Sequence, residues 1–196
     1  MYLWYSGGEL VIKGCALARV RAMRLLLTGN PGVGKTTLIR TVISLLDDVV
    51  CAGFYTEEKR HARQRIGFRI VTLDGDDGTL ASIGRKKPTV GQYSVHIEEF
   101  EKLILPTLDP DVTPADLYVI DEIGKMELLS RAFREALVNL LARPTNLLAT
   151  IAKRGQGFIE QIKMRNDINL IEVSPTNRDR LAVDIQRKIK TELGGP

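Results

Sequence analysis

The sequence predicts an α/β three-layer sandwich, in which a mainly parallel sheet carries helices on both faces and a β-hairpin is inserted. Three observations lead to this fold class. The 196 residues are 44% hydrophobic, which is enough for one substantial core. Short apolar runs of strand length alternate with segments whose apolar residues recur at helical spacing. A glycine-rich stretch over residues 29–36 separates the first strand from the first helix.

The first elements predict a strand, a loop, a helix and a second strand. The strand is the apolar run at 25–27, and the second strand covers 49–55. The helix between them is indicated by apolar residues at helical spacing, namely Leu38, Val42, Leu45 and Leu46. Two more apolar runs, 66–73 and 80–83, flank a turn rich in Asp and Gly. We therefore expect an inserted hairpin over about residues 60–93.

The second half continues the same alternation. The predicted elements are a helix over 97–108, a strand over 117–120, a helix marked by Leu129, Phe133, Leu137, Leu140 and Leu141, a strand over 147–151, a short helix over 158–164, a strand over 170–173, and a closing helix marked by Leu181, Ile185 and Ile189. Strands joined by crossover helices predict a parallel sheet that binds ligands at the carboxyl ends of its strands.

The first 22 residues stand apart from this pattern. They carry no signal-peptide cleavage pattern, and Met23 opens a natural first strand. We expect an N-terminal extension over 1–22 and a single domain over 23–196. One hypothesis is that translation begins at Met23, and its rival is an added edge strand over Glu9–Ile12.

Composition limits the classes of partner and compartment. With 28 basic and 24 acidic residues, the formal charge of +4 is mild and spread along the chain, so a nucleic-acid partner is unsupported. Cys15 and Cys51 are too few for a disulfide framework and lack zinc-site spacing, which favours a reducing compartment. No apolar stretch approaches the roughly 20 residues that span a bilayer. We expect a soluble, cytoplasmic protein without membrane contact, and a monomer.

The glycine-rich stretch is a phosphate-binding motif. Its residues fit G-x-x-x-x-G-K-[ST] in full and are Gly29, Asn30, Pro31, Gly32, Val33, Gly34, Lys35 and Thr36, with Thr37 next in the helix. Glycines let successive backbone amides point at phosphate oxygens beside the positive end of a helix. Lys35 is expected to reach the β and γ phosphates, and the Thr36 hydroxyl to ligate Mg²⁺. The fold class is therefore that of a P-loop NTPase.

Two acids at the end of the 117–120 strand complete a predicted magnesium triphosphate site. Asp121 is expected to hold Mg²⁺, and Glu122 to orient or deprotonate a water that attacks the γ phosphate. The plainer alternatives are a cap or turn residue for Asp121 and a solvated surface acid for Glu122.

Basic residues after residue 151 are candidates for stabilising the transferred phosphoryl group. Lys153, Arg154 and Arg165 flank the strand end and the short helix that follows, where an arginine would neutralise developing charge. The sequence does not decide among these three; Arg165 is the candidate chosen for this role, and an ordinary solvated side chain is the alternative for each.

The run from Ile120 to Leu128, IDEIGKMEL, is more distinctive than a generic acidic strand end. It resembles the P-loop nucleoside-triphosphatase family first described from thermophiles, which includes the cancer-related nucleoside-triphosphatases. Further matches follow in the order of that family: GFYTEE at 53–58, RIGF at 65–68, VGQY at 90–93 and TNR at 176–178. The resemblance covers about Met23 to Ile189.

This resemblance implies slow, Mg²⁺-dependent hydrolysis of ATP, GTP and other nucleoside triphosphates to the diphosphate and phosphate. It also implies that Asn177 and Arg178 lie near the nucleobase, where a planar guanidinium stacks on any base. For Asn177 the alternative is a helix cap.

Two other functions stay open at this point. A nucleotide or small-molecule kinase shares the same loop, and residues 60–93 would supply its acceptor pocket. A nucleotide-dependent regulator is the third class. The acidic pair favours a sheet with an additional strand beside the P-loop strand, although the strand count also fits a kinase-like order.

Overall fold

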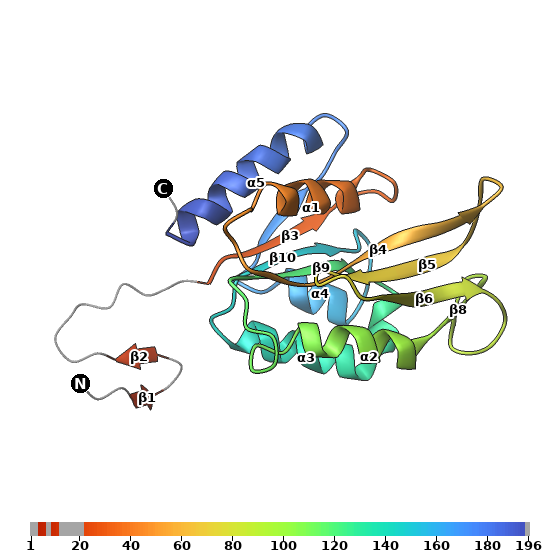
Figure 1. The fold of residues 1–196 in the computed structure, drawn as a ribbon, viewed down its shortest axis with the longest axis horizontal. Helices are drawn as coiled ribbons and strands as arrows, with labels where there is room; N and C mark the ends of the chain where they lie inside the picture. Colours follow the sequence, from red (N-terminus) through yellow and green to blue (C-terminus); the bar gives the residue numbers. More distant parts are fainter. Residues whose placement is uncertain (1–3, 7–8, 12–21, 195–196) are drawn as a thin grey trace.

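The computed structural model describes residues 4–6, 9–11 and 22–194 (Figure 1). Its strands are β1 (Trp4–Ser6), β2 (Glu9–Val11), β3 (Arg24–Thr28), β4 (Cys51–His61), β5 (Gln64–Thr72), β6 (Asp77–Ile83), β7 (Thr89–Val90), β8 (Tyr93–Val95), β9 (Leu117–Ile123), β10 (Leu147–Ile151) and β11 (Asn169–Glu172). Its helices are α1 (Lys35–Ser44), α2 (Ile97–Thr107), α3 (Arg131–Ala142), α4 (Phe158–Lys163) and α5 (Arg178–Glu192), with a 3-10 turn, η1, at Glu127–Leu129.

A nine-stranded sheet in the order β11-β3-β10-β9-β4-β5-β6-β8-β7 forms the centre of the molecule. The first five strands in this order are all parallel. Strand β10 lies between β3, which leads into the P-loop, and β9, which carries the acidic pair near its carboxyl end. The additional-strand order that the acidic pair favoured is therefore confirmed, and the kinase-like order is not adopted.

Helices cover both faces of the parallel strands, which confirms the three-layer sandwich (Figure 1). Helices α1 and α5 pack on one face, and α2, α3 and α4 pack on the other. Successive side chains of β3 point to opposite faces of the sheet. Leu25 and Leu27 pack against α1 and α5, whereas Leu26 packs on the face covered by α2, α3 and α4. On this second face Phe54, Phe100 and Phe133 contact one another edge to face, with ring centroids 5.4–6.1 Å apart.

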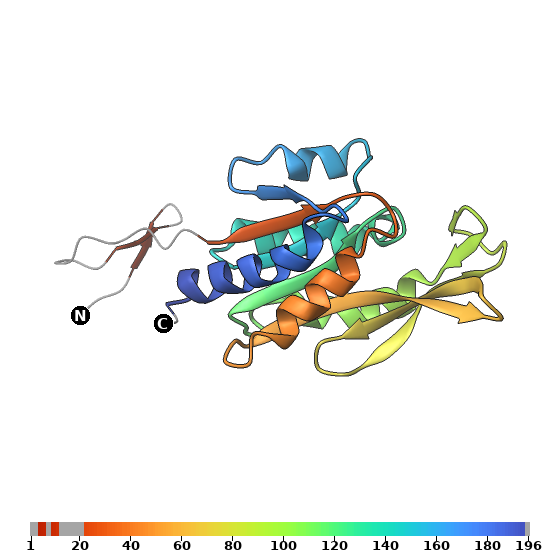
Figure 2. The ribbon, with the colours of Figure 1, turned by 90° about the horizontal axis from the view of Figure 1, so that it is seen from above.

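The insertion is larger than the expected hairpin. Strand β4 continues beyond its parallel pairing and forms a long antiparallel ladder with β5, to which β6, β8 and β7 are added (Figures 1 and 2). The two extra strands, β7 and β8, were not predicted because they are only two and three residues long and carry no apolar run. We call β5, β6, β7, β8 and the part of β4 that pairs with β5 the antiparallel extension.

Only part of the N-terminal extension lies within the described residues. A strand does occur at Glu9–Val11, but it pairs with β1 in a separate two-stranded sheet and is not an edge strand of the central sheet. The remainder of the 1–22 extension lies outside the described residues, apart from Ala22. Among the residues that the structure describes, no helix is long and apolar enough to cross a membrane.

Candidate active site

The P-loop needs its glycines for two different reasons. Gly32 and Gly34 have φ values of +76° and +100°, and Gly34 forms the left-handed cap from which α1 begins. Gly29 needs its hydrogen because a Cβ there would lie 2.6 Å from the Val173 carbonyl oxygen after β11. The loop is therefore shaped by its own backbone and held against the neighbouring strand end.

Lys35 and Glu122 meet above the carboxyl ends of β3 and β9. Lys35 is the first residue of α1 and is 9% exposed, and its Nζ lies 3.8 Å from Glu122 Oε2. Burial raises the pKa of the Glu122 carboxyl and the charge of Asp121 adds to that rise, while the Lys35 ammonium opposes it. A carboxylate with a raised pKa is the better proton acceptor.

Asp121 is almost fully buried, and its two oxygens differ in environment. Oδ1 accepts a 2.6 Å hydrogen bond from the Thr150 hydroxyl on β10, whereas Oδ2 is buried and has no partner among the residues that the structure describes. Burial raises the pKa of Asp121, and the Thr150 hydrogen bond together with the nearby Thr36 hydroxyl opposes that rise. A buried oxygen without a partner, close to a threonine hydroxyl, matches the oxygen donors that Mg²⁺ takes in proteins. Thr36 and Asp121 thus fit the metal that the sequence predicted.

Helix α5 contacts the P-loop through its first residue, Arg178. Arg178 Nη1 lies 3.4 Å from the Val33 carbonyl oxygen, and its side chain stays about half exposed. Asn177 is used differently: its amide accepts from the Ser174 N–H at 2.8 Å and donates to the Glu172 carbonyl at 2.9 Å. Asn177 does occupy the N-cap position of α5, but its side chain closes its own loop and makes no cap hydrogen bond to the helix.

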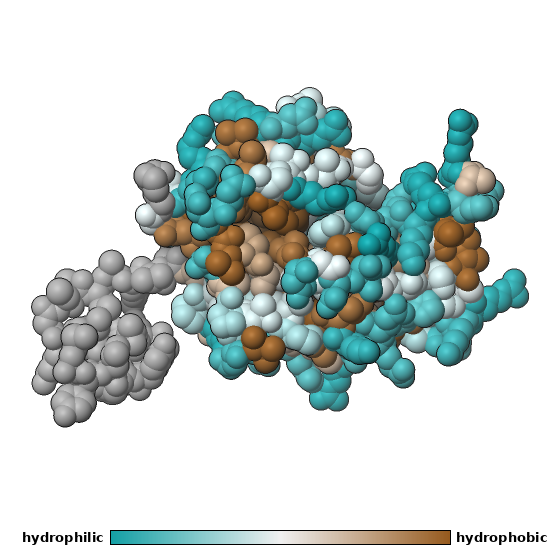
Figure 3. Space-filling view, viewed as in Figure 1, coloured by the Kyte–Doolittle hydropathy of each residue, from teal (hydrophilic) through white to brown (hydrophobic). Residues whose placement is uncertain are grey.

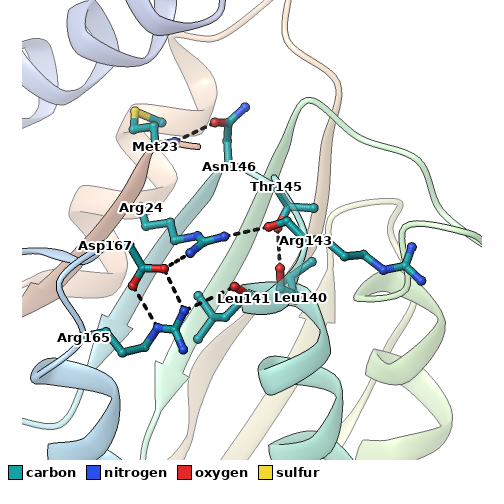
Figure 4. Close-up of polar contacts among 9 residues, drawn as sticks. All are labelled: Met23, Arg24, Leu140, Leu141, Arg143, Thr145, Asn146, Arg165 and Asp167. Carbon is teal, nitrogen blue, oxygen red and sulfur yellow. Dashed lines mark hydrogen bonds and ion pairs between the residues drawn. The ribbon is translucent and has the colours of Figure 1, made fainter. Parts of the chain in front are cut away.

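Arg165 lies at the opposite end of the sheet, which corrects the expectation that it reaches the phosphates (Figure 4). It donates to Asp167 through two nitrogens and to the Leu141 carbonyl, and Asp167 also pairs with Arg24. Arg24 begins β3 and the P-loop follows the end of that strand, roughly 13 Å away at about 3.3 Å per residue. The residues after α4 turn back to the amino edge, which the sequence did not indicate.

The other basic residues after β10 do stay at the carboxyl edge. Lys153 Nζ pairs with Glu172 Oε1 at 2.6 Å and its carbonyl accepts from Lys163, which joins this loop to the end of β11. Arg154 is exposed beside it.

Sequence reasoning missed two buried polar residues at the site. Thr150 was passed over inside an apolar strand, although a lone hydroxyl in such a run is a signal because it needs a partner. Glu127 belongs to the distinctive run after the acidic pair, and it is fully buried with its carboxyl near the backbone N–H groups of Gly124 and of Glu127 itself. A Cβ on Gly124 would lie 2.8 Å from Glu127 Oε2 and 3.1 Å from Glu122 Oε1, so both carboxyl groups border this glycine.

Comparison with known proteins identifies relatives over nearly the whole described domain. A family model described as NTPase matches residues 24–186. The chain is 43% identical over 173 residues to the nucleoside-triphosphatase THEP1 of Thermotoga maritima, covering 88% of this chain and 98% of the relative. It is also 43% identical over 180 residues to the human cancer-related nucleoside-triphosphatase, covering 84% and 95% of the two chains.

Two solved structures share the fold. The crystal structure of THEP1 from Aquifex aeolicus superposes with a TM-score of 0.78 at 37% identity, covering 86% of this chain and 99% of the other. The solution structure of a human cancer-related nucleoside triphosphatase gives a TM-score of 0.75 at 41% identity, covering 87% and 98%.

Proposed function

This chain belongs to the nucleoside-triphosphatase family and is a nucleoside-triphosphatase, and we propose that it works with Mg²⁺ through a water activated by Glu122. One observation carries this proposal. Lys35, Glu122 and the buried, unpartnered Oδ2 of Asp121 lie together at the carboxyl ends of the parallel strands. The resemblance of the IDEIGKMEL run led to the same function.

Substrate binding begins at the P-loop. Its backbone amides and the positive end of α1 surround the β and γ phosphates, and the Lys35 ammonium pairs with their oxygens. Thr36 and Asp121 would hold Mg²⁺, which when bound neutralises charge on the β and γ phosphate oxygens. Thr37, in the first turn of α1, would add one more hydroxyl to the phosphate-binding loop.

Hydrolysis then needs one proton transfer. A water oxygen forms a bond to the γ phosphorus as the bond from phosphorus to the bridging oxygen breaks, and the nucleoside diphosphate leaves with that oxygen. Glu122 accepts the proton from the attacking water and releases it to solvent afterwards. Lys35 favours the ionised form of Glu122 before the reaction and pairs with the phosphates during it.

Tolerance of different bases follows from two side chains at the start of α5. The Asn177 amide, which has the donor and acceptor needed to distinguish bases, is engaged in its own loop. Arg178 offers a planar guanidinium that stacks on any base. Arg178→Ala should raise KM for ATP, GTP, CTP and UTP by similar factors.

The decisive variant is Glu122→Gln. It keeps the shape of the side chain and removes its basicity, so nucleotide affinity should change less than threefold while kcat falls by about 10² to 10⁴. Phosphate release measures kcat, and a fluorescent nucleotide analogue measures binding. Retention of more than about half of wild-type kcat would remove Glu122 from the mechanism.

The same assay separates the remaining alternatives. Lys35→Ala is the control, because activity that survives in that variant comes from a contaminant. A panel of NTPs and dNTPs with and without Mg²⁺ tests the metal and the base tolerance. A kinase would instead show γ-phosphate loss that depends on an acceptor and leaves a phosphorylated product.

A further inference from the structure

The end of the antiparallel extension is strongly basic. Two segments form it: the β4–β5 turn at residues 60–65 and the loop that follows β6 at residues 84–88. Together they carry six Arg and Lys side chains and no carboxylate; the cations are Arg60, Arg63, Arg65, Arg85, Lys86 and Lys87. We call this surface the basic tip.

The strand register brings the two segments together although the whole of β5 and β6 separates them in sequence. Ser82 of β6 pairs with Gly67 of β5, so β6 leaves the sheet at the same end at which β5 begins with Gln64 and Arg65. Both ribbon views place the two segments at the same far end of the extension, where the β4–β5 turn curves away from the loop that follows β6 (Figures 1 and 2). The sequence did not indicate that the two segments lie at the same end, because it shows only two short basic clusters at 60–65 and 85–87.

The charge of the basic tip is poorly neutralised within the protein. Glu58, on β4 before the turn, accepts from both Arg60 and Arg65, and these hydrogen bonds hold its pKa below the usual range although burial opposes them. Within residues 22–194, the side chains of Arg63, Arg85, Lys86 and Lys87 form no ion pair, and all four are exposed. The acids of the 74–77 turn lie at the other end of β5 and β6.

Flat and apolar side chains lie among these cations. Phe68 and Tyr93 contact edge to face with centroids 5.2 Å apart, and the Arg65 guanidinium lies 5.4 Å from the centre of the Phe68 ring. Ile66 is 39% exposed and Ile83 is 54% exposed. The space-filling view shows a small hydrophobic patch at this end, flanked by hydrophilic side chains (Figure 3).

We propose that the basic tip binds single-stranded nucleic acid, with its unpaired cations on the phosphodiester backbone and with bases against the Arg65 and Tyr93 side chains. Cations that follow a backbone, together with planar groups on which unpaired bases stack, are the two elements of single-strand recognition. A duplex offers phosphates to the cations but keeps its bases stacked inside the helix. It would therefore contact the cations and not the planar side chains.

This surface is separate from the nucleotide site. The cations that form it lie beyond the parallel strands whose carboxyl ends carry Lys35 and Asp121. Binding at the tip therefore does not depend on the hydrolysis mechanism proposed above, and failure of one proposal leaves the other standing.

The test uses the full chain and fluorescein-labelled oligo-U and oligo-dT of about 20 nucleotides, long enough for one binding site, in fluorescence anisotropy. At physiological salt we expect a Kd of about 1–100 µM, the range of non-specific binding, and tighter binding at about 50 mM salt. Reversing the four unpaired cations, with Arg63→Glu, Arg85→Glu, Lys86→Glu and Lys87→Glu in one variant, should weaken binding at least tenfold. The slope of log Kd against log salt should fall by about 3, since each single-strand phosphate contact contributes about 0.7.

A matched control carries four charge reversals at exposed positions elsewhere: Lys102→Glu, Arg131→Glu, Arg187→Glu and Lys188→Glu. It should weaken binding less than threefold. Hydrolysis of ATP without nucleic acid should stay within twofold of wild type in both variants, which shows that they are folded.

Four results would overturn the proposal. They are no binding at low salt, equal weakening in the two variants, duplex binding as tight as single-strand binding, or capture by vesicles that contain anionic phosphatidylserine without any oligonucleotide binding. The last result would make the tip a lipid-binding surface.

Discussion

At the scale of single residues, the site depends on how each buried carboxyl group is partnered. Asp121 has one oxygen held by Thr150 and one left open, whereas Glu122 faces the Lys35 ammonium. Glu127 is buried close to both acids, and none of the groups that shift its pKa is a cation. Three acids close to one another thus have three different environments, and environment decides which acid is able to act as ligand or base.

The Thr150 hydroxyl should decide how well Asp121 binds metal. Thr150→Val keeps the volume but leaves Asp121 Oδ1 buried without a partner, so the side chain is free to rotate. Loss of an outer hydrogen bond to a metal ligand typically costs 10- to 100-fold in metal affinity, and we expect the half-saturating Mg²⁺ concentration to rise by about tenfold. Mg²⁺-dependent binding of a fluorescent nucleotide measures it. Thr150→Ser should restore wild-type affinity; if Val and Ser variants behave alike, the hydroxyl has no such role.

Glu127 should make the stability of the protein depend on pH. Burial raises its pKa from an ordinary 4.5 to about 8, and the charges of Glu122 and Asp121 add to that rise. The folded chain therefore holds a proton that the unfolded chain releases, so this stabilisation is complete below about pH 4.5 and is lost as pH rises through 8.

Urea unfolding of wild type and Glu127→Gln at pH 5, 7 and 9 measures this effect. The wild type should lose free energy of unfolding towards pH 9, and the variant should lose less by an amount of the order of a few kcal/mol. Glu98→Gln, at an exposed acid, is the control and should follow the wild type. Identical pH slopes in wild type and Glu127→Gln would show that Glu127 does not bind the proton.

At the scale of secondary-structure elements, the edge strand β11 is fastened at both of its ends. At its carboxyl end Lys153 pairs with Glu172, and the Asn177 amide holds the following loop. Before its amino end, Asp167 pairs with both Arg24 and Arg165 (Figure 4). β11 is only four residues long and is largely exposed, so it buries little apolar surface. These side-chain contacts therefore help to hold it in the sheet.

The position of Arg165 leads to a prediction that separates stability from catalysis. Arg165→Ala removes two hydrogen bonds to Asp167 and one to the Leu141 carbonyl, and should lower the free energy of unfolding by about 1–2 kcal/mol. It should leave kcat within twofold, because the side chain lies at the amino edge of the sheet. Thermal unfolding and phosphate release measure the two effects. A hundredfold loss of kcat without loss of stability would return Arg165 to the catalytic site.

At the scale of the whole molecule, the sheet separates three surfaces. Its carboxyl edge carries the P-loop and the acidic pair, its amino edge carries the Arg24, Asp167 and Arg165 cluster, and the antiparallel extension carries the basic tip. The +4 formal charge gives no indication of this, since it is a sum over the chain. Charge becomes a recognition surface only where folding concentrates it.

Local patterns in the sequence determined much of this protein. Helical spacing of apolar residues predicted α1, α2 and α5 because burial of one face fixes that period, and the P-loop was predicted because phosphate binding requires glycine conformations and a lysine at fixed spacing. Asp121 and Glu122 were found because carboxyl groups are costly to bury, so a pair of them at the end of an apolar strand indicates a ligand or a charged partner.

Only the tertiary structure decided which distant residues meet. Strand order placed β10 between β3 and β9 and so gave Asp121 its partner Thr150, 29 residues along the chain in no shared motif. The reversal of the chain after α4 took Arg165 to the wrong edge for catalysis, and the pairing of β5 with β6 gathered the basic tip. The physical reason is common to all three: periodicity and spacing describe contacts made within one element, whereas these contacts depend on how elements pair and turn.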